Sequence, residues 1–190
     1  MASRPHGKVG DGINLSHLLV GSEGTLAYSS AITLKLSPLP SKKIMGVCHF
    51  PSFYEAMDAA QHIVTLNPVA VELVDDTMIS LAHRIDMFKP TVEAVVNGNP
   101  KSLLLVEFAE EQMDENHQRL KKLHQLMGDL GYSWDKTKKI GGVIDVIDDK
   151  LQSKVSEMRK SGLNIMMSMK DDAKPVSFIE ELVCFAKDKG

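Results

Sequence analysis

The sequence predicts an α+β sandwich in which helices cover one face of an antiparallel β-sheet. Short apolar runs rich in β-branched residues alternate with longer stretches in which apolar residues recur at helical spacing. Clusters of Pro, Gly, Asn and Ser separate these stretches, as turns do. The resulting order is strand–helix–strand, then a helix, then strand–helix–strand, which is typical of this class.

Composition narrows the classes of function. The chain has 190 residues, of which 43% are hydrophobic and 25% charged, as in ordinary globular proteins. Its net charge of -3 gives no basic field for nucleic acid. Apolar runs fall short of the roughly 20 residues that span a bilayer. Cys48 and Cys184 form no disulfide framework. We therefore expect reduced thiols and a cytoplasmic protein.

Two strands separated by a break are expected in the first fifty residues. Residues 31–36 alternate around β-branched members and predict a strand. Residues 37–41, which contain two prolines, break the pattern and are the best linker candidate. Residues 44–50 then predict a second strand.

The following helix is predicted from a capping box. Ser52 has Glu55 three residues later, so each side chain can bond the other's backbone N–H. Apolar residues then repeat at helical spacing until Asn67 and Pro68 end the helix. Residues 69–74 predict the next strand.

A second helix is predicted after that strand, with Asp75 or Asp76 as its cap. Pro90 interrupts this helix because its ring removes a backbone donor. Residues 91–96 form a short element whose type stays open, and residues 97–100 (Asn-Gly-Asn-Pro) predict a turn.

The most apolar run, residues 102–108, predicts a central strand. A long helix over residues 111–130 follows, and Gly131 suits the position just beyond its end. The remaining expected elements are a strand over 143–147 and a helix from Asp149 through Lys160 that Gly162 ends.

A loop bracketed by glycines, residues 21–26 (Gly-Ser-Glu-Gly-Thr-Leu), is the most informative motif. Glycine has no Cβ and adopts positive φ, so such a loop lets backbone N–H groups approach a ligand closely. Successive N–H groups can then form a concavity that suits phosphate oxygens. A tight turn between strands is the alternative interpretation of the same residues.

Residues 14–27 closely resemble the flavin-contacting segment of the FAD-linked oxidase and dehydrogenase family. This family includes D-lactate, glycolate and D-2-hydroxyglutarate dehydrogenases. Ala27 stands where the family pattern has a glycine. Residues 33–40 resemble the strand and proline hinge that leave the family's FAD domain. Residues 158–170 resemble a branch of large enzymes that carry an iron–sulfur C-terminal part. The family's recurrent P-x-A-x-E-x-x-D pattern is matched by Pro68, Ala70, Glu72 and Asp75.

The resemblance implies a domain organisation. Residues 1–40 are expected to be a C-terminal remnant of the FAD-binding domain. Residues 41–190 are expected to be an incomplete cap, or substrate, domain with a ferredoxin-like antiparallel sheet. The family's main FAD subdomain and its histidine-rich motifs are expected outside this chain. We therefore expect a fragment of a larger flavoenzyme that contains no catalytic residue of its own.

The resemblance also implies site residues. The expected FAD contacts are Gly21, Ser22, Glu23, Gly24, Thr25 and Leu26. Arg159 is expected to bind a substrate carboxylate, which a guanidinium can hold with two hydrogen bonds. The alternative for Arg159 is a solvated cation at a helix end. Lys170 and Lys174 are candidates for the same anionic pocket, although surface lysines are commoner. The seven histidines have no metal-ligand spacing, so no metal is expected.

Two functions follow as hypotheses. The first is a part of an FAD-dependent oxidoreductase that oxidises a D-2-hydroxy acid of the lactate, glycolate or 2-hydroxyglutarate type by hydride transfer to flavin. The second is a non-catalytic ferredoxin-like binding or assembly module derived from such an enzyme. Expected partners are the small 2-hydroxy acid and the FAD subdomain or another protein surface. An apolar docking face would also favour homo-oligomers.

Overall fold

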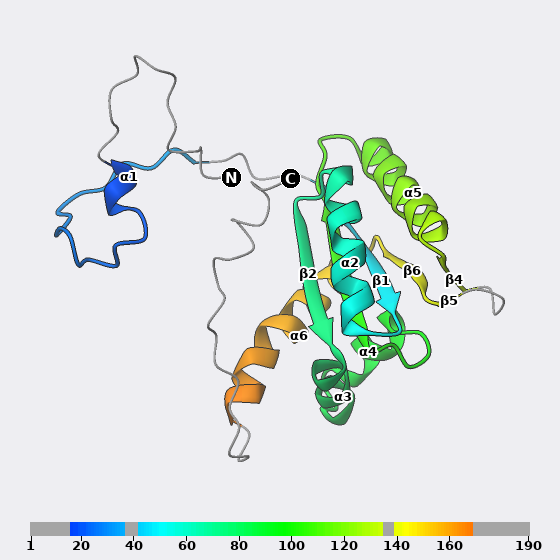
Figure 1. Cartoon of the computed structure of the whole chain (residues 1–190). Helices are drawn as coiled ribbons and strands as arrows, with labels where there is room; N and C mark the ends of the chain where they lie inside the picture. Colours follow the sequence, from blue (N-terminus) through cyan, green and yellow to red (C-terminus); the bar gives the residue numbers. More distant parts are fainter. Residues whose placement is uncertain (1–15, 37–41, 135–138, 169–190) are drawn as a thin grey trace. The chain divides into compact units, whose positions relative to one another are not determined.

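The computed structural model describes residues 16–36, 42–134 and 139–168 (Figure 1). The chain divides into two units, Met1–Leu39 and Pro40–Gly190. The first unit contains the short helix α1, Ser16–Leu19, followed by a turn. Residues 27–36 form neither helix nor strand, so the predicted strand over 31–36 is wrong. A strand needs a neighbour to complete its hydrogen bonds, and the described part of this unit offers none.

The second unit is built on a four-stranded antiparallel sheet in the order β2-β3-β1-β6. Its strands are β1 Ile44–Phe50, β2 Ala70–Asp75, β3 Ser102–Phe108 and β6 Gly142–Val146. Two further short strands, β4 Tyr132–Ser133 and β5 Lys139–Ile140, pair in parallel. Since β1 and β3 occupy the centre of the sheet, the predicted central position of residues 102–108 is confirmed. This order is that of a ferredoxin-like βαββαβ unit.

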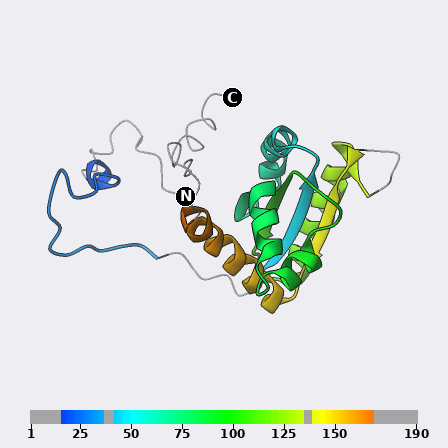
Figure 2. The same ribbon diagram turned by 90° about the horizontal axis from the view of Figure 1, so that it is seen from below.

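Helices cover both faces of the sheet. The crossover helices α2, Phe53–Ile63, and α5, Met113–Asp129, pack on one face, as expected for the ferredoxin-like unit. The other face is covered by α3 Asp76–Arg84, α4 Lys89–Val95 and α6 Asp149–Ser168. Figure 2 gives the view from below, in which the orange α6 lies across the sheet from α2. The α+β class is confirmed, but the prediction that helices cover only one face is wrong.

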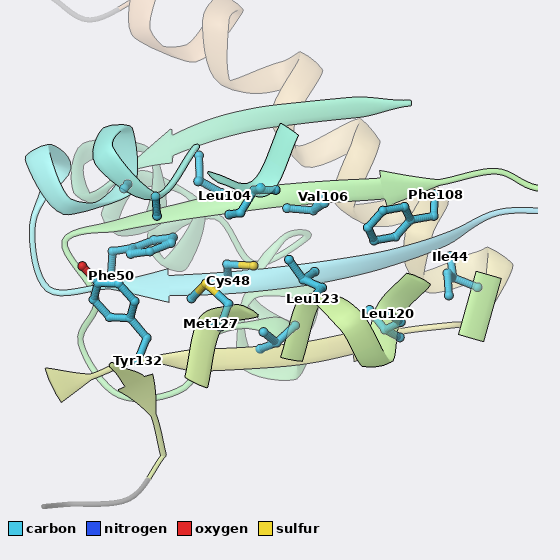
Figure 3. Close-up of a cluster of buried hydrophobic side chains, with 14 residues drawn as sticks. Ile44, Cys48, Phe50, Leu104, Val106, Phe108, Leu120, Leu123, Met127 and Tyr132 are labelled. Carbon is cyan, nitrogen blue, oxygen red and sulfur yellow. The ribbon is translucent and has the colours of Figure 1, made fainter. Parts of the chain in front are cut away.

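Each face has its own apolar core. Figure 3 shows the first core, in which alternate residues of β1 and β3 meet the buried stripe of α5. Gly46 belongs to this face of β1, and a Cβ there would lie 2.6 Å from the Leu123 side chain. Glycine therefore lets α5 pack close to the sheet. On the opposite face, Val47 and Leu105 are buried against residues such as Val155 of α6. This second core arises because the central strands are apolar on both sides.

The ends of the helices follow the sequence in part. The cap at Ser52 is confirmed, since its Oγ accepts from the Glu55 N–H at 3.2 Å, and the Glu55 carboxylate accepts from the Ser52 hydroxyl at 2.8 Å. Asp75 caps α3 by accepting from the Met78 N–H at 2.8 Å. Asp148 rather than Asp149 caps α6, since its Oδ1 accepts from the Leu151 N–H at 2.8 Å.

Two predictions about Pro90 and Gly162 need correction. Pro90 does not interrupt α3, which already ends at Arg84; it lies in the first turn of α4, where its missing N–H costs nothing. Gly162 does not end α6, which continues to Ser168. A Cβ at Gly162 would overlap the Met78 side chain of α3, so the glycine allows α3 and α6 to approach. By contrast, Gly131 does follow α5 with a φ of 91°, as predicted.

Candidate functional site

The loop over residues 21–26 forms a tight turn. Glu23 and Gly24 have φ values of 47° and 80°, so two consecutive residues are in the left-handed region. The Thr25 N–H donates to the Ser22 carbonyl oxygen at 2.9 Å, and the Thr25 hydroxyl donates to the same oxygen at 2.6 Å. Positive φ at both central positions is the pattern of a type I′ turn. The loop is therefore a tight turn, as the alternative interpretation had it, but it follows helix α1 and no strand flanks it among the described residues.

This turn also fits contact with a phosphate-bearing cofactor. The N–H groups of Glu23 and Gly24 take part in no backbone hydrogen bond among the residues described. A Cβ on Gly21 or Gly24 would meet no atom within 4 Å, so the loop is open on both glycines. The backbone N–H groups of Glu23 and Gly24 in this open turn are therefore the donors that could reach FAD oxygens, because the Thr25 hydroxyl already donates to Ser22.

Apolar side chains on both sides of the turn are exposed. Before it, Leu18 and Val20 are exposed, and after it Leu26 and Tyr28, the last with 94% of its surface accessible. Exposed apolar residues gathered in one segment mark a surface for a partner or ligand. The described residues of this unit bury none of these four side chains.

Arg159 lies on α6 and is paired with Glu72 of strand β2. The Nε of Arg159 lies 2.5 Å from Glu72 Oε2, and both side chains are a little over one third exposed. Arg159 is therefore not a solitary cation at a helix end. Because α6 continues to Ser168, Arg159 lies within the helix, away from its last turn. The other expected substrate residues, Lys170 and Lys174, lie outside the described residues.

The neighbouring side chains fix where Arg159 can point. Val155 and Met158 of α6 are buried against the sheet, which sets the rotation of the helix about its axis. Glu72 is paired with Leu105 across the β2–β3 ladder, and directly opposite residues share one face of a sheet. Leu105 belongs to the core beneath α6, so Glu72 projects toward this helix.

A polar groove of about 480 Å³ lies along α6, and neither Arg159 nor Glu72 is among the residues that line it. Lys43 lies 2.7 Å from Glu107 in an ion pair at one side of the groove. Lys160, the residue after Arg159, also lines the groove. The lining residues are Lys43, Glu107, Asp149, Gln152, Ser153, Ser156, Glu157 and Lys160. The lining of the groove therefore carries charges of both signs.

The interpretation of the sequence did not identify Glu72 as the partner of Arg159. The available signal was a single acidic residue inside an otherwise apolar strand. A carboxylate at such a position needs a cation nearby, because an unpaired charge on a covered sheet face is costly. Nothing in the sequence pattern specified which cation this would be.

Histidines and acidic residues form no evident metal centre. Within the described ranges, no group of three or more His, Cys, Asp or Glu residues is placed to hold a metal ion. His49 is buried, and its Nε2 accepts from the Asn97 N–H at 3.1 Å while Nδ1 lies 2.9 Å from the Val47 carbonyl oxygen. Burial lowers the pKa of His49, so its ring is a neutral structural group.

Comparison with known proteins decides the family. Residues 39–187 match the family described as FAD linked oxidases, C-terminal domain. The chain belongs to this FAD-linked oxidase family. Arg159 and Glu72 both lie inside the matched range, whereas the loop over 21–26 precedes it. The resemblance inferred from the sequence is confirmed, and FAD is the cofactor to which this family is linked.

Similar proteins with curated names are dehydrogenases of 2-hydroxy acids. The chain is 36% identical over 102 residues to a probable mitochondrial D-lactate dehydrogenase of Danio rerio, covering 50% of this chain. It is 30% identical over 172 residues to a D-2-hydroxyglutarate dehydrogenase of Pantoea ananatis and 29% identical over 181 residues to that of Escherichia coli, each alignment covering 88% of this chain. The chain spans 20%, 16% and 17% of these relatives, respectively.

The described residues contain no helix that is both long enough and apolar enough to cross a membrane.

Proposed function

We propose that this chain is part of an FAD-dependent oxidoreductase that oxidises a D-2-hydroxy acid by hydride transfer to flavin. The observation that carries the proposal is Arg159, a partly exposed guanidinium held by Glu72 of β2 inside a domain of the FAD-linked oxidase family. The names of the similar proteins point to lactate or 2-hydroxyglutarate as the type of acid. The cytoplasmic location remains part of this proposal, and the buried free thiol of Cys48 is compatible with it.

In this proposal the two units have separate tasks. The first unit, which corresponds to the expected remnant over residues 1–40, borders FAD through the backbone and hydroxyl groups of residues 21–26. FAD supplies the hydride acceptor when bound. The exposed apolar side chains around the loop dock against the rest of the FAD-binding domain, or against a second copy of the chain when that domain is absent.

The second unit supplies the substrate contact. Arg159 binds the carboxylate of the 2-hydroxy acid through its guanidinium, because planar paired donors match a carboxylate. Lys170 and Lys174 are further proposed contacts of the same substrate carboxylate. The base that takes the hydroxyl proton is not assigned to this chain.

A second candidate, a non-catalytic binding or assembly module, is favoured by a specific observation. The sheet of the second unit has both faces covered, and both cores are completed by side chains from residues 44–158. The apolar cores of such a unit are formed by its own side chains, without a cofactor. The module hypothesis therefore predicts a stable protein that takes up no flavin.

Flavin uptake distinguishes the two candidates. The chain is dialysed against FAD, and bound flavin is measured by its blue absorbance after removal of free FAD. An FAD contact at residues 21–26 that is sufficient for binding predicts retained flavin, which is lost when these residues are replaced by a Ser-rich loop of equal length. A well-folded protein that retains no flavin favours the module.

A further inference from the structure

The ion pair between Glu72 and Arg159 joins the edge strand β2 to α6. The two residues are 87 positions apart in the sequence and belong to elements that pack through the second core. Both remain partly exposed, so a small molecule can reach the guanidinium while Glu72 holds it. This combination differs from a buried structural pair, whose charges are closed to ligands.

Contact at Nε orients the guanidinium. Nε is the nitrogen nearest the side-chain stem, and the two Nη groups lie at the far end of the planar fork. A carboxylate in contact with Nε therefore restrains the plane of the group, whose Nη end carries further N–H donors. A free arginine side chain samples many rotamers, and restricting it to one of them when a ligand binds costs conformational entropy.

We propose that Glu72 is a positioning residue that fixes the guanidinium of Arg159 so that its Nη groups face the carboxylate of the 2-hydroxy acid. This inference rests on the proposed function, because it takes Arg159 as the substrate contact. Glu72 itself touches no substrate. It acts through the geometry of Arg159.

The negative charge of Glu72 weakens substrate binding, whereas its contact with Arg159 strengthens it. These opposite effects make the proposal testable. Glu72 and the substrate are both anionic, so the charge of Glu72 weakens substrate binding, by about threefold at 7 Å in a water-like dielectric. Glu72→Gln removes the charge but keeps an oxygen that accepts from Nε. Glu72→Ala removes both charge and acceptor. The two substitutions therefore separate positioning from electrostatics.

The experiment follows the Nε–H signal of Arg159 by NMR in the full 190-residue chain during titration with D-lactate. Positioning predicts that E72A weakens D-lactate binding about tenfold, since small misplacements of a contact are costly. E72Q stays within about threefold of the wild type. Glu72→Thr, which suits a strand and is also too short to reach, replaces E72A if that variant unfolds.

Glu110→Ala is the matched control. Glu110 pairs with Arg119 at 2.9 Å, and this pair has a similar exposure but joins elements on the other face of the sheet. E110A is expected to leave D-lactate binding unchanged. Equal weakening by E72A and E110A would show a general loss of structure and overturn the positioning role.

Two further outcomes separate this inference from the proposed function. If the wild type binds D-lactate at Arg159 and E72A binds it equally well, Glu72 has no positioning role, while the proposed function stands. If the Arg159 signal depends on Glu72 but does not respond to D-lactate, D-2-hydroxyglutarate or glycolate, the substrate role of Arg159 fails and the inference fails with it.

Discussion

Gln152 of α6 donates a hydrogen bond from Nε2 to the carbonyl oxygen of Lys43 at 3.0 Å, just before the chain enters β1. Its Nε2 also lies 3.0 Å from the Ile147 carbonyl oxygen, and the residue is buried. Asn116 of α5 makes the equivalent contact from the opposite face, donating to the Lys42 carbonyl oxygen at 3.3 Å. Two buried carboxamides thus hold consecutive carbonyl groups at the start of the second unit, from both sides of the sheet.

Loss of either carboxamide side chain is expected to destabilise the segment at Lys42 and Lys43 that leads into β1. Asn116→Ala leaves two partly buried backbone groups without their side-chain partner, because Asn116 Oδ1 also accepts from the Glu110 N–H at 2.9 Å. We expect the free energy of unfolding to fall by about 2 kcal/mol. Trypsin cleavage after Lys42 or Lys43 should be faster than in the wild type. Gln118→Ala, at an exposed position of the same helix, is the control and should change neither quantity.

Filling the space at Gly46 is expected to destabilise the first core. A Cβ there would lie 2.6 Å from Leu123 Cδ2 and 3.0 Å from Leu120 Cδ1, with β6 closing the third side. Gly46→Ala should lower the free energy of unfolding by about 1 to 3 kcal/mol through overpacking. Urea denaturation measures the change. Gly128→Ala, where no atom lies within 4 Å of the added carbon, should be neutral or stabilising.

The buried ring of His49 predicts a pH dependence of stability. Burial lowers its folded pKa below the ordinary value of 6.5, so the unfolded chain binds the proton more readily. The contribution of His49 is therefore complete above pH 6.5 and declines as the pH falls through and below that value, by at most about 1.4 kcal/mol per pH unit. Denaturation curves at several pH values for the wild type and His49→Gln should differ in this slope. An identical slope in both proteins would contradict the assignment.

A substitution in the glycine turn tests its role at FAD. Gly24 has a φ of 80°, and alanine is strained there by about 1–2 kcal/mol although no atom obstructs its Cβ. Gly24→Ala should therefore weaken FAD binding about tenfold while the melting of the second unit stays unchanged. Ser29→Ala, an exposed change in the same unit, should bind FAD like the wild type. FAD fluorescence quenching provides the measurement.

Local sequence patterns predicted the elements of the second unit well, because caps and strand patterns depend on residues that are close in the sequence. The cap at Ser52 and the central strand over 102–108 were predicted, and Asp75 was one of two predicted candidates for the cap of α3. The strand over 31–36 was not confirmed, since alternation alone supplies no pairing strand. The continuation of α6 beyond Gly162 depends on Met78 of another helix, a contact that no local pattern reveals.

The candidate site was predicted through the family resemblance more than through the residues. That resemblance singled out Arg159, and the structure places it on α6. The partner of Arg159 could not be predicted, because Glu72 meets it only after β2 and α6 pack on the same face. The roles of residues 21–26 and Arg159 remain predictions.

The central claim is tested most directly by flavin reduction in a chimera. Residues 39–187 replace the aligned segment of the Pantoea ananatis relative, and the folded, FAD-loaded chimera is mixed anaerobically with D-2-hydroxyglutarate, D-lactate or glycolate. The account predicts that at least one of these acids bleaches the blue absorbance of the flavin, and that Arg159→Ala abolishes this bleaching without loss of FAD. Flavin that stays oxidised with all three acids, or that is bleached equally well in the Arg159→Ala chimera, would contradict it.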